Sequence, residues 1–200
     1  MNVVVMADER NEAGAKSTGA DSVRHTRRMK SSSEVSHAPD QILLEALLDS
    51  WARNNTILLN LLGALPDGSL EARAMEGGTS VAELFTHIHF VRLVFVSEDA
   101  PECATDLPVQ EWAAERDRGR IANMLKESAK VVEEAVKSRA EAGRAMDLHY
   151  DHPILLLQHM IWHEGYHHGQ IKLVLKMTGR PIANPQAGPL TWGVWMRKKK

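Results

Sequence analysis

Apolar side chains recur every three or four positions along four long stretches of the chain, which is the spacing of amphipathic α-helices. The pattern predicts helices over residues 40–64, from 79 or 80 to 97, over 109–143 with a break near Gly119, and over 153–179. No stretch alternates apolar and polar side chains for long enough to predict a strand. No run of about 18 apolar residues predicts a membrane span. The fold class predicted is therefore all-α, a four-helix bundle.

Residues typical of helix boundaries support these limits. Ser80 is followed three positions later by Glu83, the pattern of a capping box at a helix N-terminus. Pro153 suits the first turn of the last helix, and Gly179 with Pro181 marks its end.

The two ends of the chain differ in composition from its middle. Residues 1–37 are rich in Ser, Lys, Arg, Asp and Glu and nearly free of large apolar side chains after Met6. Such a segment cannot bury enough apolar surface to fold, so we predict a flexible, disordered N-terminal tail. Its apolar run is too short for a secretory signal. Residues 38–200 form the predicted bundle domain, including a short C-terminal extension.

The C-terminal extension carries two tryptophans, Trp192 and Trp195, on either side of Val194. Side chains this apolar are costly to leave in water. We expect them to pack on the bundle near the end of the last helix or in a subunit interface.

Histidines recur at helical spacing in the last predicted helix, at His159, His163 and His167. Positions four apart lie about 40° apart around a helix, so His163 and His167 can face one ion. They share their side of the helix with apolar side chains, where an imidazole without a partner is costly. The pattern therefore predicts either a bound metal or a buried polar network, and we favour the metal because imidazole is a common metal ligand.

The second helix offers a third ligand. His87 lies on the side of that helix occupied by Leu84, Val91 and Val94, whereas His89 lies about 200° away, beside Arg92. We therefore predict that His87 faces the core and that His89 does not. Three histidines with coordination positions left for water or substrate are typical of catalytic rather than structural zinc.

Charge and cysteine content narrow the range of binding partners and of cellular locations. The net charge of −2 gives no electrostatic reason to expect a nucleic acid or an anionic membrane as partner. The single cysteine, Cys103, excludes an internal disulfide framework and is compatible with a reducing cytoplasm, which is the location we predict.

Three segments together resemble the DinB/YfiT family of bacterial metalloproteins: SVAELFTHIHFVRL, QHMIWHEGYHHGQIKLVLKMTGRP and TWGVW. The resemblance covers roughly residues 40–197. It implies an up-down-down-up bundle, often a homodimer, that holds a divalent ion such as zinc or nickel. Carried over by position, the family's metal ligands fall on His87, His163 and His167. A link of about 12 residues between the second and third helices suits a crossover that leaves them parallel.

The chain departs from the commoner family pattern at His168, where Arg is frequent, and at His159, an additional imidazole. We expect His168 to face outward. Three histidines spread over about 80° and about 12 Å of helix rise are hard to aim at one ion, so we place His159 near the site and outside the ligand set.

Some relatives are thiol-dependent S-transferases or isomerases in which the metal holds the thiolate of bacillithiol or mycothiol. By that resemblance we predict a metal-dependent enzyme of thiol S-transferase type acting on a small-molecule substrate. The alternatives are a metal-dependent hydrolase and a non-catalytic metal-binding stress-response protein. A fourth protein ligand on the metal would favour the non-catalytic protein. Asn54, Asn55 and Tyr166 are candidate polar contacts, although amides on a solvent-facing arc and a tyrosine at the bundle edge explain them more simply.

Overall fold

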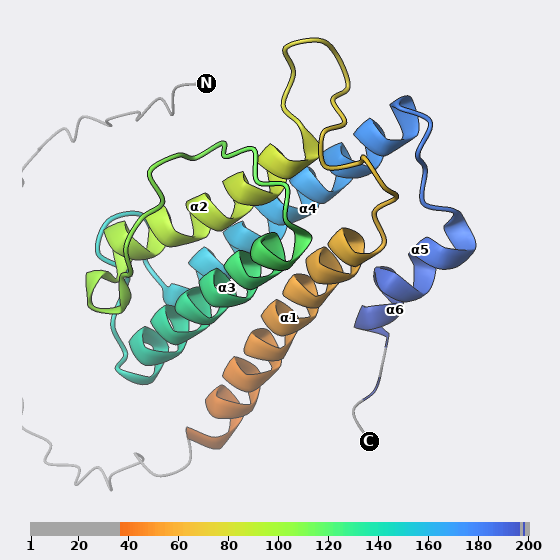
Figure 1. The fold of residues 1–200 in the computed structure, drawn as a ribbon. Coiled ribbons are helices and arrows are strands. Elements are labelled where there is room, and N and C mark those ends of the chain that lie inside the picture. The colour runs from red at the N-terminus through yellow and green to blue at the C-terminus, as the bar shows by residue number, and fades with distance from the viewer. Residues whose placement is uncertain (1–36, 197, 199–200) are drawn as a thin grey trace, which may run out of the picture. The chain divides into compact units, whose positions relative to one another are not determined.

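The computed structural model describes residues 37–196 and 198, and the fold they form is helical (Figure 1). Four long helices make up its body: α1 (His37–Gly63), α2 (Val81–Asp99), α3 (Arg118–Glu141) and α4 (Pro153–Met177). Three short ones follow α2 or α4: η1 (Pro101–Cys103), α5 (Asn184–Leu190) and α6 (Trp192–Trp195). The predicted tail lies outside the described residues, except for His37, which begins α1.

Within residues 37–196 there is no strand, only an isolated bridge between Arg73 and Ser80. None of the helices in this part of the chain is long and apolar enough to cross a membrane. The all-α prediction is therefore confirmed.

The four long helices run up-down-down-up. Helices α1 and α2 lie diagonally opposite, and each contacts both α3 and α4. His89 and Arg92 of α2 bond the carbonyls of Met124 and Leu125 in α3, so these helices run parallel. The start of α2 shares an apolar cluster with the end of α4, so this pair is antiparallel.

Side-chain caps fix where two of these helices begin. The capping box is present, because the Ser80 hydroxyl accepts the Glu83 N–H and the Glu83 carboxylate accepts the Ser80 N–H. Helix α3 begins at Arg118 and not near residue 109, because the Asp117 carboxylate accepts the N–H groups of Gly119 and Arg120. The connection before α3 is correspondingly longer than the sequence predicts.

The core consists of two apolar clusters. One gathers the end of α1, the starts of α2 and α3 and the end of α4, and includes Leu58, Leu61, Phe85, Ile121 and Ile171. The other lies toward the opposite ends of the same helices, and includes Trp51, Val96, Val132, Leu156 and Met160.

A polar layer separates the two clusters along every helix. The Arg92 guanidinium donates two hydrogen bonds to the Glu164 carboxylate, of 2.6 and 2.8 Å, and both side chains are fully buried. Asn54 of α1 donates to the same carboxylate at 2.5 Å. Arg92 also donates to Asn55 of α1 and to the Leu125 carbonyl of α3. We call these residues the central polar network, and it joins all four long helices.

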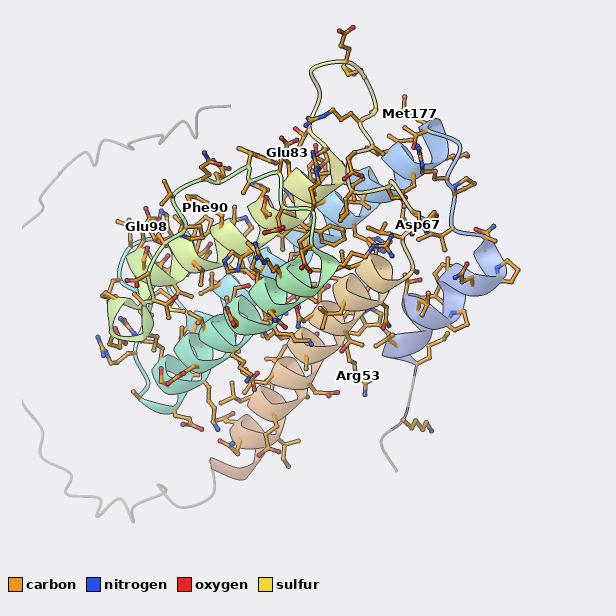
Figure 2. The ribbon with its side chains drawn as sticks, in the orientation of Figure 1. Arg53, Asp67, Glu83, Phe90, Glu98 and Met177 are labelled. Atoms are coloured by element: carbon orange, nitrogen blue, oxygen red, sulfur yellow. The ribbon has the colours of Figure 1, made fainter. Side chains whose placement is uncertain are left out.

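The C-terminal extension packs along α1. Asn60 donates to the Leu190 carbonyl at 3.0 Å, and Arg53 donates to the Val194 carbonyl at 2.5 Å. Figure 2 labels Arg53 on the side of α1 that faces α6. Val194 is the buried side chain, whereas Trp192 and Trp195 stay 53% and 42% exposed. The extension therefore packs beside α1 and not at the end of α4.

Arg92→Met should lower the free energy of unfolding by about 3–5 kcal/mol, because it leaves the Glu164 charge buried without its partner. Urea unfolding measures this loss. Arg120→Met is the control, since the Arg120 side chain is 74% exposed and its 3.7 Å ion pair with Glu115 contributes little to stability. The double variant Arg92→Met/Glu164→Leu should recover much of the loss. Equal costs for Arg92→Met and Arg120→Met would show that the network does not hold the helices together.

Candidate metal centre

Two helices bring three histidines together. His87 lies in the second turn of α2, and His163 and His167 lie one turn apart in α4. The Nε2 atom of His163 is 3.2 Å from that of His87 and 3.0 Å from that of His167. We call this group the three-histidine cluster.

A partner outside the cluster orients one of its rings. The Nδ1 atom of His167 lies 2.7 Å from Oε1 of Gln170. A neutral imidazole has one N–H, and an oxygen acceptor draws it to the nitrogen it faces. Nδ1 of His167 therefore carries the proton, and its Nε2 atom turns a lone pair toward the cluster. Oε1 of Glu111 lies 2.8 Å from Nδ1 of His87, but that nitrogen has no hydrogen-bond partner among the described residues, so Glu111 places a negative charge beside the ring without fixing its tautomer.

The imidazoles of the cluster are held neutral. Burial, with smaller coulombic contributions from His167, His87, His159 and Arg92, lowers the pKa of His163 to about 3. Burial and His167 lower the pKa of His87 to about 4. Burial also lowers the pKa of His167, although its contact with Gln170 opposes this. Neutral imidazole is the form that binds a metal.

The donor set fits a single transition-metal ion. Two nitrogens each about 2.0–2.1 Å from one zinc ion in tetrahedral arrangement lie about 3.4 Å apart, close to the separations observed. Lone pairs that face one another at such distances repel unless a proton or a cation lies between them. In the described part of the chain, these three histidines are the group of potential metal ligands whose ligand atoms all lie within 4.8 Å of one another.

A model of the DinB family matches residues 35–188. The chain belongs to the DinB family. The matched range contains the three-histidine cluster and all four long helices. Searches against curated proteins and against solved structures returned no match.

His159 lies outside the cluster of this DinB-family protein. Its Nδ1 atom is 2.7 Å from the Tyr150 hydroxyl, and its ring centroid is 6.4 Å from that of His163. The structure places it beside the cluster and outside it, and its exclusion from the metal ligands stays a prediction.

Three polar side chains predicted to face outward are instead covered. His89 is buried, with Nδ1 2.8 Å from the Met124 carbonyl, because α3 packs against that side of α2. Asn54 is buried in the central polar network, which Asn55 also joins. His168 is only partly exposed, because it faces the C-terminal extension. Tyr166 is more than half exposed and accepts a hydrogen bond from Gln170.

Sequence reasoning missed Glu111 and Trp112, which reach the cluster from the connection before α3. The Trp112 ring stacks on His87 with centroids 3.9 Å apart and planes 3° from parallel. A helix beginning at residue 109 would have carried these residues on a different course. Asp117 was the available signal, since Asp is a favoured N-cap residue and its carboxylate caps α3.

His163→Ala should abolish stoichiometric binding of a divalent ion, because it removes the nitrogen that lies between the other two. Metal analysis of protein purified without an affinity tag, with zinc and nickel added, measures the stoichiometry. His89→Ala is the control. It should lower the melting temperature, because it removes a buried contact with α3, and it should leave one ion per chain. Equal loss of metal in both variants would exclude the cluster as the binding site.

Proposed function

We propose that this protein binds one divalent ion, zinc or nickel, through His87, His163 and His167 and acts as a thiol S-transferase on a small molecule. The observation that carries the proposal is the convergence of three Nε2 atoms, one of them oriented from behind by Gln170. Among the described residues the group contains three protein ligands and no fourth. Three-ligand sites are typical of metals that also bind a substrate or a cofactor.

A zinc or nickel ion held there would supply Lewis acidity, which lowers the pKa of a coordinated thiol and favours the thiolate. The side chains of the protein supply orientation and surroundings. Gln170 holds the His167 ring by a hydrogen bond, Trp112 stacks on the His87 ring, and burial keeps the cluster largely out of water.

Exposed aromatic side chains next to the cluster suit an apolar substrate. Trp112 stacks on His87 and is 39% exposed. Tyr166 meets His167 edge-on at 5.2 Å, and Trp162 stacks on Tyr166. We call Trp112, Trp162 and Tyr166 the aromatic rim. Their faces offer apolar contact area close to the histidines.

The metal-loaded protein should accelerate attack of bacillithiol or mycothiol on chlorodinitrobenzene, in which the thiolate sulfur forms the new carbon–sulfur bond and chloride leaves. Absorbance of the thioether follows the reaction. His163→Ala should lose the acceleration, and His89→Ala should keep it. Full metal loading with no acceleration by either thiol would support the non-catalytic alternative. Thiol-independent cleavage of an activated ester would support the hydrolase.

We also propose that the protein is a homodimer, paired through an exposed stripe of large side chains along α4. The stripe consists of residues 48% to 70% exposed, spaced seven, four, seven and four positions apart: Leu155, Trp162, Tyr166, Leu173 and Met177. This spacing keeps them on one side of the helix. Leu155 and Met177 are equally distant from Tyr166 along α4. Two antiparallel copies of α4 that cross at Tyr166 therefore place Leu155 of each copy against Met177 of the other. A self-complementary patch of this kind suits two-fold pairing, and because Trp162 and Tyr166 also belong to the aromatic rim, the substrate would then bind at the boundary between the two subunits.

Leu173→Glu should shift the protein from dimer to monomer in sedimentation velocity, because it puts a charge in the stripe. Met75→Glu is the matched control, since Met75 is 70% exposed and lies in the connection before α2. A Leu173→Glu protein that sediments as the parent does would exclude this face as the interface.

A further inference from the structure

A cavity separate from the three-histidine cluster lies between α1, α4 and the C-terminal extension. Its volume is about 290 Å³. The lining side chains that decide which ligand fits are Ile57, Leu58, Ile161, His168, Trp192 and Trp195. None of the three clustered histidines lines it.

The wall formed by the extension is fixed in position. Hydrogen bonds from Arg53 and Asn60 hold α6 and the end of α5 against α1. A Cβ atom on Gly188 would lie 3.0 Å from the Trp192 ring, which is tighter than most real contacts of a Cβ atom. Glycine at this position therefore lets the indole rest against α5 and face the cavity.

The opening of the cavity is kept free by a second glycine. Gly165 is exposed and lines the cavity, and a Cβ atom on it would meet nothing within 4 Å. A larger side chain at residue 165 would therefore occupy the opening.

The lining favours an uncharged, mainly apolar ligand. No lysine or arginine contributes to it, so an anion has no counter-charge there. The one carboxylate, Glu164, is already bound by Arg92 and Asn54. An apolar cavity of about 150 Å³ is enough to hold benzene, so this one can take a substituted aromatic ring.

One polar atom in the wall lacks a partner. The Nε2 atom of His168 is buried and has no hydrogen-bond partner among the described residues. A buried polar atom without a hydrogen-bond partner destabilises the folded state. Because His168 also lines the cavity, a ligand hydroxyl that reaches this atom would supply the missing partner.

We propose that this cavity binds a small, uncharged aromatic molecule carrying one hydroxyl group. The ring lies against Trp192, Trp195 and the aliphatic side chains of α1, and the hydroxyl bonds His168. This site needs no metal, so its test is independent of the proposed transferase activity.

Titration of the full chain with para-cresol tests the proposal. Calorimetry measures the binding, and the NMR signals of the indole N–H groups report where the ligand lies. The expected result is saturable binding of one molecule per chain that shifts the signals of Trp192 and Trp195. Gly165→Leu should weaken binding by at least about tenfold. Gly169→Leu should leave it unchanged, since Gly169 is also exposed on α4 with open space around it but does not line the cavity.

Toluene tests the role of His168, because it lacks the hydroxyl. The parent protein should prefer para-cresol to toluene by about tenfold, and His168→Phe should lose that preference. Shifts confined to Trp112 and Trp162 would place the ligand at the aromatic rim and overturn the proposal. So would the absence of saturable binding, or equal weakening by Gly165→Leu and Gly169→Leu. The indole signals of the parent protein distinguish the cavity from the aromatic rim even if a variant fails to fold.

Discussion

The buried ion pair between Arg92 and Glu164 is the constraint on which the arrangement of the helices depends. Two charges far from water are tolerable only when their remaining hydrogen-bonding groups find partners. Those partners come from α1 and α3: Asn54 and Asn55, the Leu125 carbonyl and the Trp51 ring, which lies 4.7 Å under the guanidinium. Burial raises the pKa of Glu164, and the contact with Arg92 opposes this by favouring the carboxylate. Moving any one helix by a turn would leave a buried charge or amide without its partner.

This constraint also orients α4, which serves several surfaces at once. With Glu164 directed into the bundle, His163 and His167 turn toward α2, and His168 and Gly165 turn toward α1 and the C-terminal extension. The remaining side of α4 carries the exposed stripe. One helix therefore contributes to the polar network, the three-histidine cluster, the cavity and the proposed dimer face, because its side chains point in all directions around a single fixed axis.

Covering segments from outside the four-helix core complete both candidate sites. The connection before α3 brings Glu111 and Trp112 to His87, and the extension brings Trp192 and Trp195 to the cavity. Both segments are irregular or only briefly helical, and side-chain hydrogen bonds to their backbones hold them in place. Thr86 of α2, for example, donates to the Ala113 carbonyl at 2.9 Å. Loops held on a rigid scaffold are where binding groups commonly lie.

The sequence by itself determined the four long helices apart from the start of α3, the capping box at Ser80, and the side of its own helix on which each of His87, His163 and His167 lies, because these follow from spacing along a single helix. It could not determine how covered each polar side chain is. His89 and Asn54 lie away from the apolar stripe of their own helices and were predicted to face solvent, yet they are buried, since a helix between two neighbours has more than one inner side. Helical periodicity reveals only the most strongly apolar side. The course of residues 100–117 and the packing of the extension were also decided by tertiary structure, because contacts distant in sequence, and not local conformational preference, hold them.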